Sequence, residues 1–237
     1  MVKSGKGYYG AVSSIDGKTE ILETKYDNIK YIRENQEFLV ESNKKKGIIT
    51  KEKKTKLQIT YDSIEKIENK NNTFYIVSEN NLYGLLDENG KRILYSEYDK
   101  IGIDIKEYSQ NLVTNGHILR ENFIPLKTEK EWFLFDIELG KVLDFPYDSF
   151  GCPKGKNNLS RTYGVLEVPS YNLIVGCKEN KYNLIDSEGK WIFEEFILDS
   201  VYITVKEGKN KYYVSIGEEQ KELDVFLQEK GIEIIHN

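Results

Sequence analysis

A short pattern recurs along this chain, and it constrains the fold more than any other feature of the sequence. The clearest copy has Tyr83-Gly84, then Asp-x-x-Gly-Lys at residues 87–91, then Tyr-Asp at residues 98–99. Related copies begin at Tyr9, Trp132 and Tyr182, and a weaker copy without Asp-x-x-Gly-Lys begins at Lys46. Several copies in the same order predict a repeat architecture, in which each unit buries its apolar face against its neighbours.

The centre of each copy has the chemistry of a tight β-turn. Asn89-Gly90 lies between the apolar pairs at residues 85–86 and 93–94, and Asn-Gly between such runs predicts a β-hairpin. Asp87 is placed to accept hydrogen bonds from backbone N–H groups of the turn. The glycine of the motif supplies the left-handed backbone that closes the turn, and it recurs as Gly90, Gly140 and Gly189.

The spacing of the copies sets the expected organisation. Tyr-Asp pairs begin at residues 26, 61, 98 and 147, in steps of 35, 37 and 49 residues. The longer steps indicate insertions around residues 104–128 and 151–172. Further strands are expected at residues 38–40, 74–77 and 173–175, and two more at 201–205 and 211–215, because each is an apolar or β-branched run. In the last part, Leu223, Phe226 and Leu227 have helical spacing and Gly231 follows as a C-cap.

We therefore predict an all-β chain with a short C-terminal helix. The repeats are an array of antiparallel β-hairpins or meanders, arranged as a propeller-like ring or as an open solenoid. One repeat domain would span residues 1–237, with units at roughly 7–42, 43–79, 80–128, 129–178 and 179–216 and a C-terminal cap at 217–237. The cap would hold the helix, within residues 218–230, and a final strand at residues 232–235.

The motif as a whole resembles the WG β-repeat family, whose units combine Trp-Gly, Asp-x-x-Gly-Lys and Tyr-Asp-x-Ile. The resemblance extends over most of residues 7–201 and is best at residues 83–84, 87–91 and 98–101. The family's Trp is mostly Tyr here, and the Gly after it remains only as Gly10, Gly47 and Gly84. This resemblance implies a β-rich interaction scaffold, found mostly in bacteria, that brings no catalytic residues with it.

Composition narrows the function classes. The formal net charge is −5 and both signs are mixed along the chain, which is typical of an ordinary soluble surface and does not favour nucleic acid. No apolar run reaches the roughly 20 residues that cross a membrane, and no signal peptide is recognisable at the start. Cytoplasmic location is the default expectation. Cys152 and Cys177 are expected to be two free thiols, although one disulfide remains an alternative.

For each candidate chemical site, a structural explanation of the residues is stronger than a functional one. Residues 151–157 lack the spacing and the Ser/Thr of a phosphate loop, and His117 has no companion ligands in the sequence. Cys152 has no recognisable base. The Asp-x-x-Gly-Lys loop is too short for an EF-type calcium site, and Glu194 and Glu195, as neighbours in a strand, would point to opposite faces. We expect no catalytic residue, no metal and no cofactor.

The strongest local charge feature is a lysine-rich stretch at residues 44–56. Seven lysines against Glu52 give 7 − 1 = +6, which would suit an acidic protein partner better than nucleic acid, since no aromatic interleaving accompanies it. Solvated lysines on an edge strand are the competing interpretation. The candidate partner-binding residues are Lys44, Lys45, Lys46, Lys51, Lys53, Lys54 and Lys56.

The function expected from these features is a non-catalytic protein-binding scaffold. An inhibitor or an immunity-type partner of a bacterial protein is one form that such a scaffold takes, but the sequence names neither the partner nor the oligomeric state. The alternative is a cell-surface or carbohydrate-binding module, for which the abundant tyrosines would supply aromatic faces.

Overall fold

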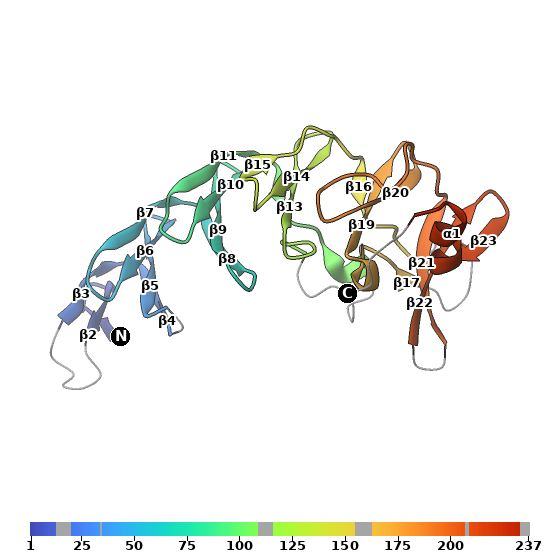
Figure 1. Cartoon of the computed structure of the whole chain (residues 1–237). Helices are drawn as coiled ribbons and strands as arrows, with labels where there is room; N and C mark the ends of the chain where they lie inside the picture. Colours follow the sequence, from blue (N-terminus) through green and yellow to red (C-terminus); the bar gives the residue numbers. More distant parts are fainter. Residues whose placement is uncertain (13–19, 34, 109–115, 155–162, 207–208, 233–237) are drawn as a thin grey trace. The chain divides into compact units, whose positions relative to one another are not determined.

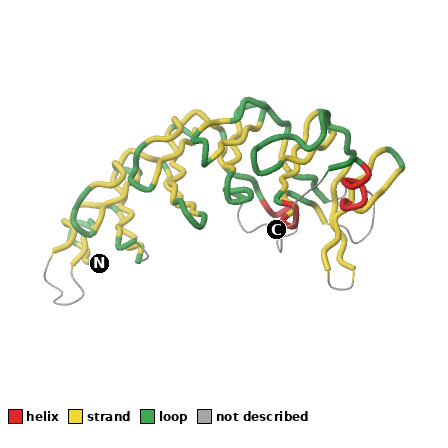
Figure 2. Tube along the Cα trace, in the orientation of Figure 1, coloured by secondary structure: helices red, strands yellow, loops and turns green. Residues whose placement is uncertain are grey.

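The computed structural model describes residues 1–12, 20–33, 35–108, 116–154, 163–206 and 209–232. Antiparallel sheets dominate the chain, and the only α-helix among the described residues is short and C-terminal (Figures 1 and 2). The all-β prediction with a C-terminal helix is confirmed at this level. Two compact units divide the chain, residues 1–99 and residues 100–237, and each is described by itself.

The first unit holds three sheets, with strand orders β1-β2-β3, β4-β5-β6-β7 and β11-β10-β9-β8. Its strands are β1 (Val2–Lys3), β2 (Tyr9–Val12), β3 (Glu20–Tyr26), β4 (Asn28–Ile32), β5 (Glu37–Ser42), β6 (Lys45–Thr50), β7 (Thr55–Tyr61), β8 (Ser63–Glu68), β9 (Thr73–Glu79), β10 (Leu82–Asp87) and β11 (Arg92–Tyr98).

The second unit holds the remaining sheets, with orders β12-β13-β14-β15, β16-β19-β18 with β20 also on β19, and β17-β21-β22-β23. Its elements are β12 (Lys100–Ile101), η1 (Ile105–Glu107), β13 (Phe123–Lys127), β14 (Trp132–Asp136), β15 (Lys141–Val142), β16 (Ser149–Phe150), β17 (Tyr163–Gly164), β18 (Glu167–Val168), η2 (Pro169–Tyr171), β19 (Leu173–Lys178), β20 (Lys181–Ile185), β21 (Ser200–Lys206), β22 (Lys209–Ile216), β23 (Glu219–Glu222) and α1 (Leu223–Glu229).

Each Tyr-Asp pair of the first unit marks a boundary between sheets. Tyr26 ends β3 and β4 begins at Asn28, and Tyr61 ends β7 and β8 begins at Ser63. Each sheet therefore runs from one Tyr-Asp pair to the next. Its boundaries are shifted along the chain from those of the units delimited in the sequence. The predicted strands at 38–40, 74–77 and 173–175 are confirmed as the inner strands β5, β9 and β19.

The aspartate of the pair fixes the hairpin end of the sheet that follows it. Asp62 donates its N–H to the carbonyl of Ser78 (2.8 Å), and its Oδ2 accepts the N–H of Asn80 (2.9 Å) in the β9–β10 turn. The same two bonds recur at Asp27 with Glu41 and Asn43, at Asp148 with Cys177 and Glu179, and at Asp199 with Ser215 and Gly217. This side chain therefore has a structural role in both units.

The Asp-x-x-Gly-Lys turns form as predicted. Asp87 Oδ1 accepts the N–H groups of Asn89 (2.9 Å) and Lys91 (2.8 Å), and Asp186 repeats this pattern with Glu188 and Lys190. Gly90, Gly140 and Gly189 all have positive φ. Because the β6–β7 turn lacks a glycine, Lys53 takes the left-handed position there, with φ +64°.

The glycine after the aromatic residue allows the next strand to approach closely. A Cβ at Gly84 would lie 2.8 Å from the Leu94 carbonyl oxygen, at the point where the register between β10 and β11 shifts. In the second unit Phe133 and Asn183 stand at this position. Asn183 is buried and donates its amide N–H to the carbonyls of Phe193 (2.7 Å) and Glu195 (3.0 Å). The chain after β20 consequently runs as an irregular segment beside that side chain.

Alternating side chains bury both faces of the β4–β7 sheet. Ile49 belongs to a cluster with Ala11 and Leu22 of the preceding sheet, whereas the adjacent Ile48 belongs to a cluster with Tyr75 and residues of the following sheet. Successive strand residues point to opposite faces, so two neighbouring isoleucines join three sheets. Buried apolar area of this kind is the main stabilising term of the unit.

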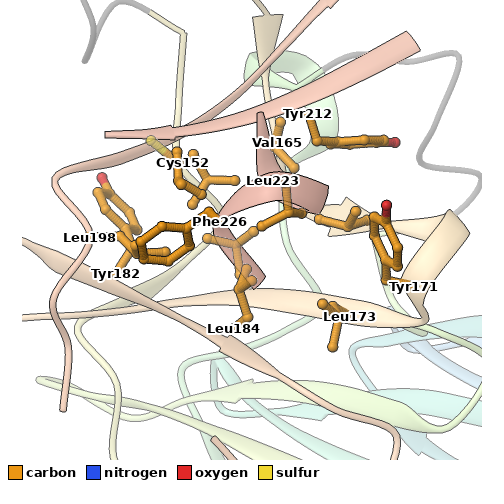
Figure 3. Close-up of a cluster of buried hydrophobic side chains, with 14 of the residues drawn as sticks. Cys152, Val165, Tyr171, Leu173, Tyr182, Leu184, Leu198, Tyr212, Leu223 and Phe226 are labelled. Atoms are coloured by element: carbon orange, nitrogen blue, oxygen red, sulfur yellow. The ribbon is translucent and has the colours of Figure 1, made fainter. Parts of the chain in front are cut away.

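The second unit has a large core around the last strands and the helix (Figure 3). Leu223, Phe226 and Leu227 of α1 are buried, as their spacing predicted. The helix starts later than expected because Glu219–Glu222 pairs with β22 as strand β23. Gly231 follows with φ +68°. The final strand expected at 232–235 lies largely outside the described residues. None of the described helices is both long and apolar enough to span a membrane.

Candidate interaction surface

The seven candidate lysines lie at opposite ends of one strand. Lys44 is in the β5–β6 turn, with Lys45 and Lys46 opening β6. The other four follow the end of β6, in and after the β6–β7 turn. A six-residue strand is about 17 Å long at ~3.3 Å per residue, so the structure separates a contiguous lysine run into two groups. Moreover, of the two strands that carry these lysines, β6 is an inner strand of its sheet and β7 is an edge strand.

Lys45 forms an ion pair with Asp62, the aspartate that binds the β9–β10 turn. Its Nζ lies 2.5 Å from Asp62 Oδ1, while Asp62 Oδ2 holds the Asn80 N–H. The ion pair with Lys45, followed by the bond from Asn80, lowers the pKa of the Asp62 carboxyl. Lys181 and Asp199 repeat this ion pair at 2.5 Å in the second unit. Lys45 therefore has a structural partner already.

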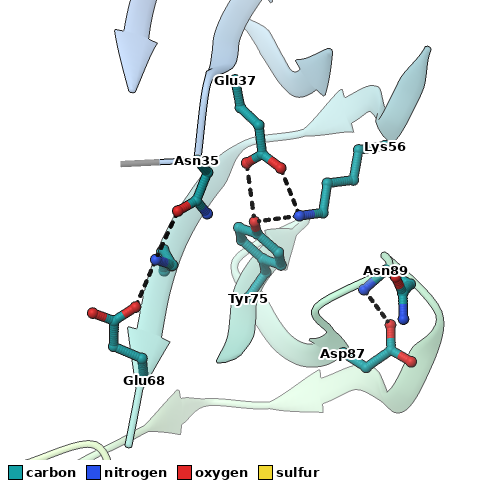
Figure 4. A network of polar contacts seen from close by, with 8 residues as sticks. Asn35, Glu37, Lys56, Glu68, Tyr75, Asp87 and Asn89 are labelled. Carbon is teal, nitrogen blue, oxygen red and sulfur yellow. Dashed lines mark hydrogen bonds and ion pairs between the residues drawn. The ribbon is translucent and has the colours of Figure 1, made fainter. Parts of the chain in front are cut away.

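Lys56 is part of a buried network between two sheets (Figure 4). Its Nζ lies 2.7 Å from Glu37 Oε1 and 3.0 Å from the Tyr75 hydroxyl, which itself donates to Glu37 Oε2 (3.2 Å). The side chains of Lys56 and Glu37 are 17% and 7% exposed. Burial alone would lower the pKa of Lys56, but the bonds to Glu37 and Tyr75 outweigh burial and raise it. Its geometry is that of an internal cross-link.

The other five lysines differ in their contacts. Lys51 donates to Gln36 Oε1, and Lys53 Nζ lies 3.9 Å from Glu20 Oε1. Within the part of the chain that the structure describes, Lys44, Lys46 and Lys54 have no side-chain hydrogen bond or ion pair, and Lys44 and Lys54 are exposed. These three are the members of the set whose charge is not paired within the described residues.

The side chains elsewhere that could act as nucleophiles or metal ligands are mostly buried. Cys152 and Cys177 are buried in the core of the second unit and form no disulfide. His117 is half-buried beside Gly102. No group of three or more His, Cys, Asp or Glu side chains within the described residues is arranged to hold a metal ion. Part of the glycine-rich loop at 151–157 lies outside the described residues.

Glu167 is a buried acid that sequence reasoning missed. It is 6% exposed and accepts the N–H of Arg120 at 2.6 Å. Arg120 Nε in turn donates to Asn172 Oδ1 (2.7 Å). Burial raises the pKa of Glu167. A carboxylate inside the apolar run Val165-Leu166-Glu167-Val168 was the available signal, since such an acid needs a polar partner. Its contacts hold the 118–122 segment against β18.

Comparisons with known proteins add no function. No protein-family model matches the sequence, and no curated protein sequence matches it. Among solved structures, the AfRom2 CNH domain is similar over 89% of this chain and 84% of that domain, at 11% sequence identity and a TM-score of 0.22. A similarity of this degree assigns neither a fold nor an activity to the chain.

Proposed function

We propose that this chain is a non-catalytic, WG-repeat-like scaffold that binds another protein through residues outside the repeat motif. The supporting observation is the use of the recurring polar side chains. Asp62, Asp87 and their counterparts bind backbone N–H groups of turns. By contrast, Lys44 and Lys46 do not recur, and the exposed side chains of Lys44 and Lys54 form no hydrogen bond or ion pair within the described residues. An acidic partner surface fits those three lysines.

An inhibitor or immunity-type partner of a bacterial protein is the specific form we favour. In such a pair the scaffold covers a functional surface of its target and needs no chemistry of its own. The tagged chain should capture one protein in a stoichiometric complex from a lysate of its source cells. That protein is then purified and its affinity is measured by calorimetry at two salt concentrations.

The lysine surface is tested on that purified complex. Lys44→Glu/Lys46→Glu/Lys54→Glu should weaken binding by about tenfold or more and should reduce the salt dependence, because long-range attraction is lost. Lys91→Glu/Lys141→Glu/Lys209→Glu, which changes net charge equally at other exposed lysines, is the matched control. Equal affinity of both triple variants would remove the lysines from the interface. Turnover of any substrate by the purified chain would contradict the non-catalytic assignment.

A carbohydrate-binding or cell-surface module is the alternative. Its support is the exposure of tyrosine side chains, of which Tyr95 is 70% exposed and stacks under Arg92 at 5.4 Å. Saturable binding to purified glycans, lost in Tyr95→Ala, would favour this alternative over the scaffold.

The repeats of such a scaffold would be arranged either as a propeller-like ring or as an open solenoid. Burial of both faces of the β4–β7 sheet suits either form. Small-angle scattering separates them, because a compact chain of this length has a radius of gyration of about 18 Å and an open array exceeds that value.

A further inference from the structure

Two segments of the second unit that correspond to β11 are largely irregular, and one of them keeps only the two-residue strand β15. Between the turn lysine and the Tyr-Asp pair, the first unit has the seven-residue strand β11. The matching stretch is shorter by one residue at 142–147 and longer by one at 191–198. Residues 143–146 and 192–197 form no strand.

These two segments bring three aromatic rings together. The Phe145 ring centroid lies 4.0 Å from that of Trp191 and 5.9 Å from that of Phe196, and the Phe145 and Phe196 planes are nearly parallel at 15°. Trp191 and Phe196 are 5.1 Å apart. All three are partly exposed. Phe145, Trp191 and Phe196 are called the aromatic surface below.

A buried layer holds the aromatic surface in place. Tyr147 lies 4.9 Å from Phe145 and is 1% exposed, and its hydroxyl accepts a hydrogen bond from Trp191 Nε1 (3.2 Å). Burial raises the pKa of Tyr147 to about 12, so its hydroxyl stays protonated. The rings therefore form a preorganised platform, and binding to such a platform orders few side chains.

The unpaired charge beside the platform is negative, since Lys190, which precedes Trp191, is paired with Glu188 at 2.5 Å. Asp144 directly precedes Phe145, and Glu194 and Glu195 directly precede Phe196; all three acids are exposed. Residues 143–146 and 191–197 contain no lysine or arginine. Across the described ranges of the chain, no cation pairs with these carboxylates or stacks on the three rings. By contrast, Lys127 Nζ already lies 5.8 Å from the Trp132 ring centroid.

From this geometry we infer that the aromatic surface docks an arginine-bearing segment of the partner protein, an inference that rests on the proposed scaffold function. A guanidinium stacks on an aromatic face and also pairs with carboxylates in the plane. Three uncompensated carboxylates repel nucleic acid and acidic peptides, and they give a neutral sugar no charge to match. Aromatic and arginine side chains are the residues that most often dominate protein interfaces.

Trp191 itself supplies the measurement. In Trp132→Phe it is the only tryptophan, since the chain has two, and its emission reports on the surface. The probes are a capped hexapeptide with two arginines and two leucines, the same peptide with neutral citrulline for arginine, and maltohexaose. We expect saturable quenching by the arginine peptide at concentrations up to about 1 mM. The affinity of the citrulline peptide should be lower by about tenfold or more.

Two variants in that background locate the binding. Glu194→Gln/Glu195→Gln and Phe145→Leu should each weaken the arginine peptide by about tenfold, whereas Glu88→Gln/Glu138→Gln, which removes the same charge from exposed positions elsewhere, should not. Thermal unfolding shows whether Phe145→Leu is folded. If that variant is unfolded, binding by Glu194→Gln/Glu195→Gln alone tests the inference. Equal binding of both peptides, no quenching, or quenching by maltohexaose instead would overturn the inference.

The natural partner separates this inference from the proposed function. If the captured protein binds Glu194→Gln/Glu195→Gln as tightly as the unaltered chain, the aromatic surface is not the docking site, although the scaffold function stands. If no protein is captured in a stoichiometric complex, the scaffold function itself fails.

Discussion

Lys53 has in the β6–β7 turn the left-handed backbone that Gly90 has in the β10–β11 turn, with φ of +64° and +83°. The hydrogen bonds of the two turns also correspond. Thr50 N–H donates to the Lys54 carbonyl (2.9 Å), as Asp87 N–H donates to the Lys91 carbonyl (2.9 Å). One turn geometry is thus kept without the Asp-x-x-Gly-Lys sequence, and a side chain at a left-handed position is strained.

Lys53→Gly should consequently stabilise the first unit. Relief of the left-handed strain outweighs the added freedom of glycine in the unfolded chain, for a net gain of about 0.5–1 kcal/mol. Urea unfolding followed by tyrosine fluorescence measures this gain. Lys54→Gly, next to it in the same turn but without positive φ, is the control and should destabilise. A loss of stability in Lys53→Gly would contradict the strain argument.

The converse substitution should be costly at Gly90 and milder at Gly140. A Cβ at Gly90 would lie 2.5 Å from the Lys56 carbonyl oxygen and 2.7 Å from Leu57 Cδ2, whereas a Cβ at Gly140 would meet no atom within 4 Å. Both glycines have positive φ, so Gly140→Ala should cost about 1 kcal/mol from the backbone alone, and Gly90→Ala should cost clearly more. Equal losses in urea unfolding would mean that the close approach at Gly90 has no energetic effect.

Removal of the Asp62 carboxylate should loosen the β9–β10 turn and leave the rest of the sheet unchanged. Asp62→Ala removes the acceptor of the Asn80 N–H, so the β9–β10 turn should open more often and the Asn80 amide should exchange with deuterium faster. The Asn43 amide, which is held by Asp27, is an internal control and should keep its rate. Uniform acceleration of both amides would indicate general destabilisation instead of a local clamp.

Acid should remove the contribution of the same carboxylates. The lysine partner and a backbone N–H lower the pKa of Asp62 and of Asp199 in the folded chain, while the unfolded value is about 3.9. A depressed folded pKa stabilises the fold above the unfolded pKa, and this stability is lost as the pH falls through the folded pKa. The deficit of Asp199→Asn relative to the unaltered chain should therefore shrink below about pH 4. Denaturant unfolding from pH 3 to 7 measures it, and a deficit that is constant with pH would contradict this cause.

How far the sequence predicts the fold depends on the distance between interacting residues. Asp87 and Gly90 act within one turn, and their roles follow from residue type. The partner of Asp62 is a backbone N–H 18 residues away, which leaves no mark on the sequence of the partner. The left-handed Lys53 was equally hidden, because the turn is imposed by the strands on either side.

The candidate site shows the same division. The charge of the lysine run was visible, but a strand separates its two halves, and the pairing of Lys56 with Glu37 joins residues 19 positions apart. The aromatic surface was missed because Phe145 and Trp191 belong to different repeats. Segment length gave no signal either, because residues 19–26 have the same length as 191–198 and still contain the regular strand β3.

Lys56 and Glu37 provide the sharpest test of which lysines are structural. Lys56→Met leaves the buried Glu37 carboxylate with only the Tyr75 hydroxyl, and loss of one member of a buried pair costs about 3 kcal/mol. Lys56→Met/Glu37→Leu removes both charges and should recover most of that loss, since an apolar replacement of a buried pair is often neutral. Urea unfolding of the single and double variants gives the coupling between the two sites. Lys44→Met, at an exposed lysine of the same run, should leave stability within about 0.5 kcal/mol. If Lys56→Met were as benign as Lys44→Met, Lys56 would rejoin the lysines that are available to a partner.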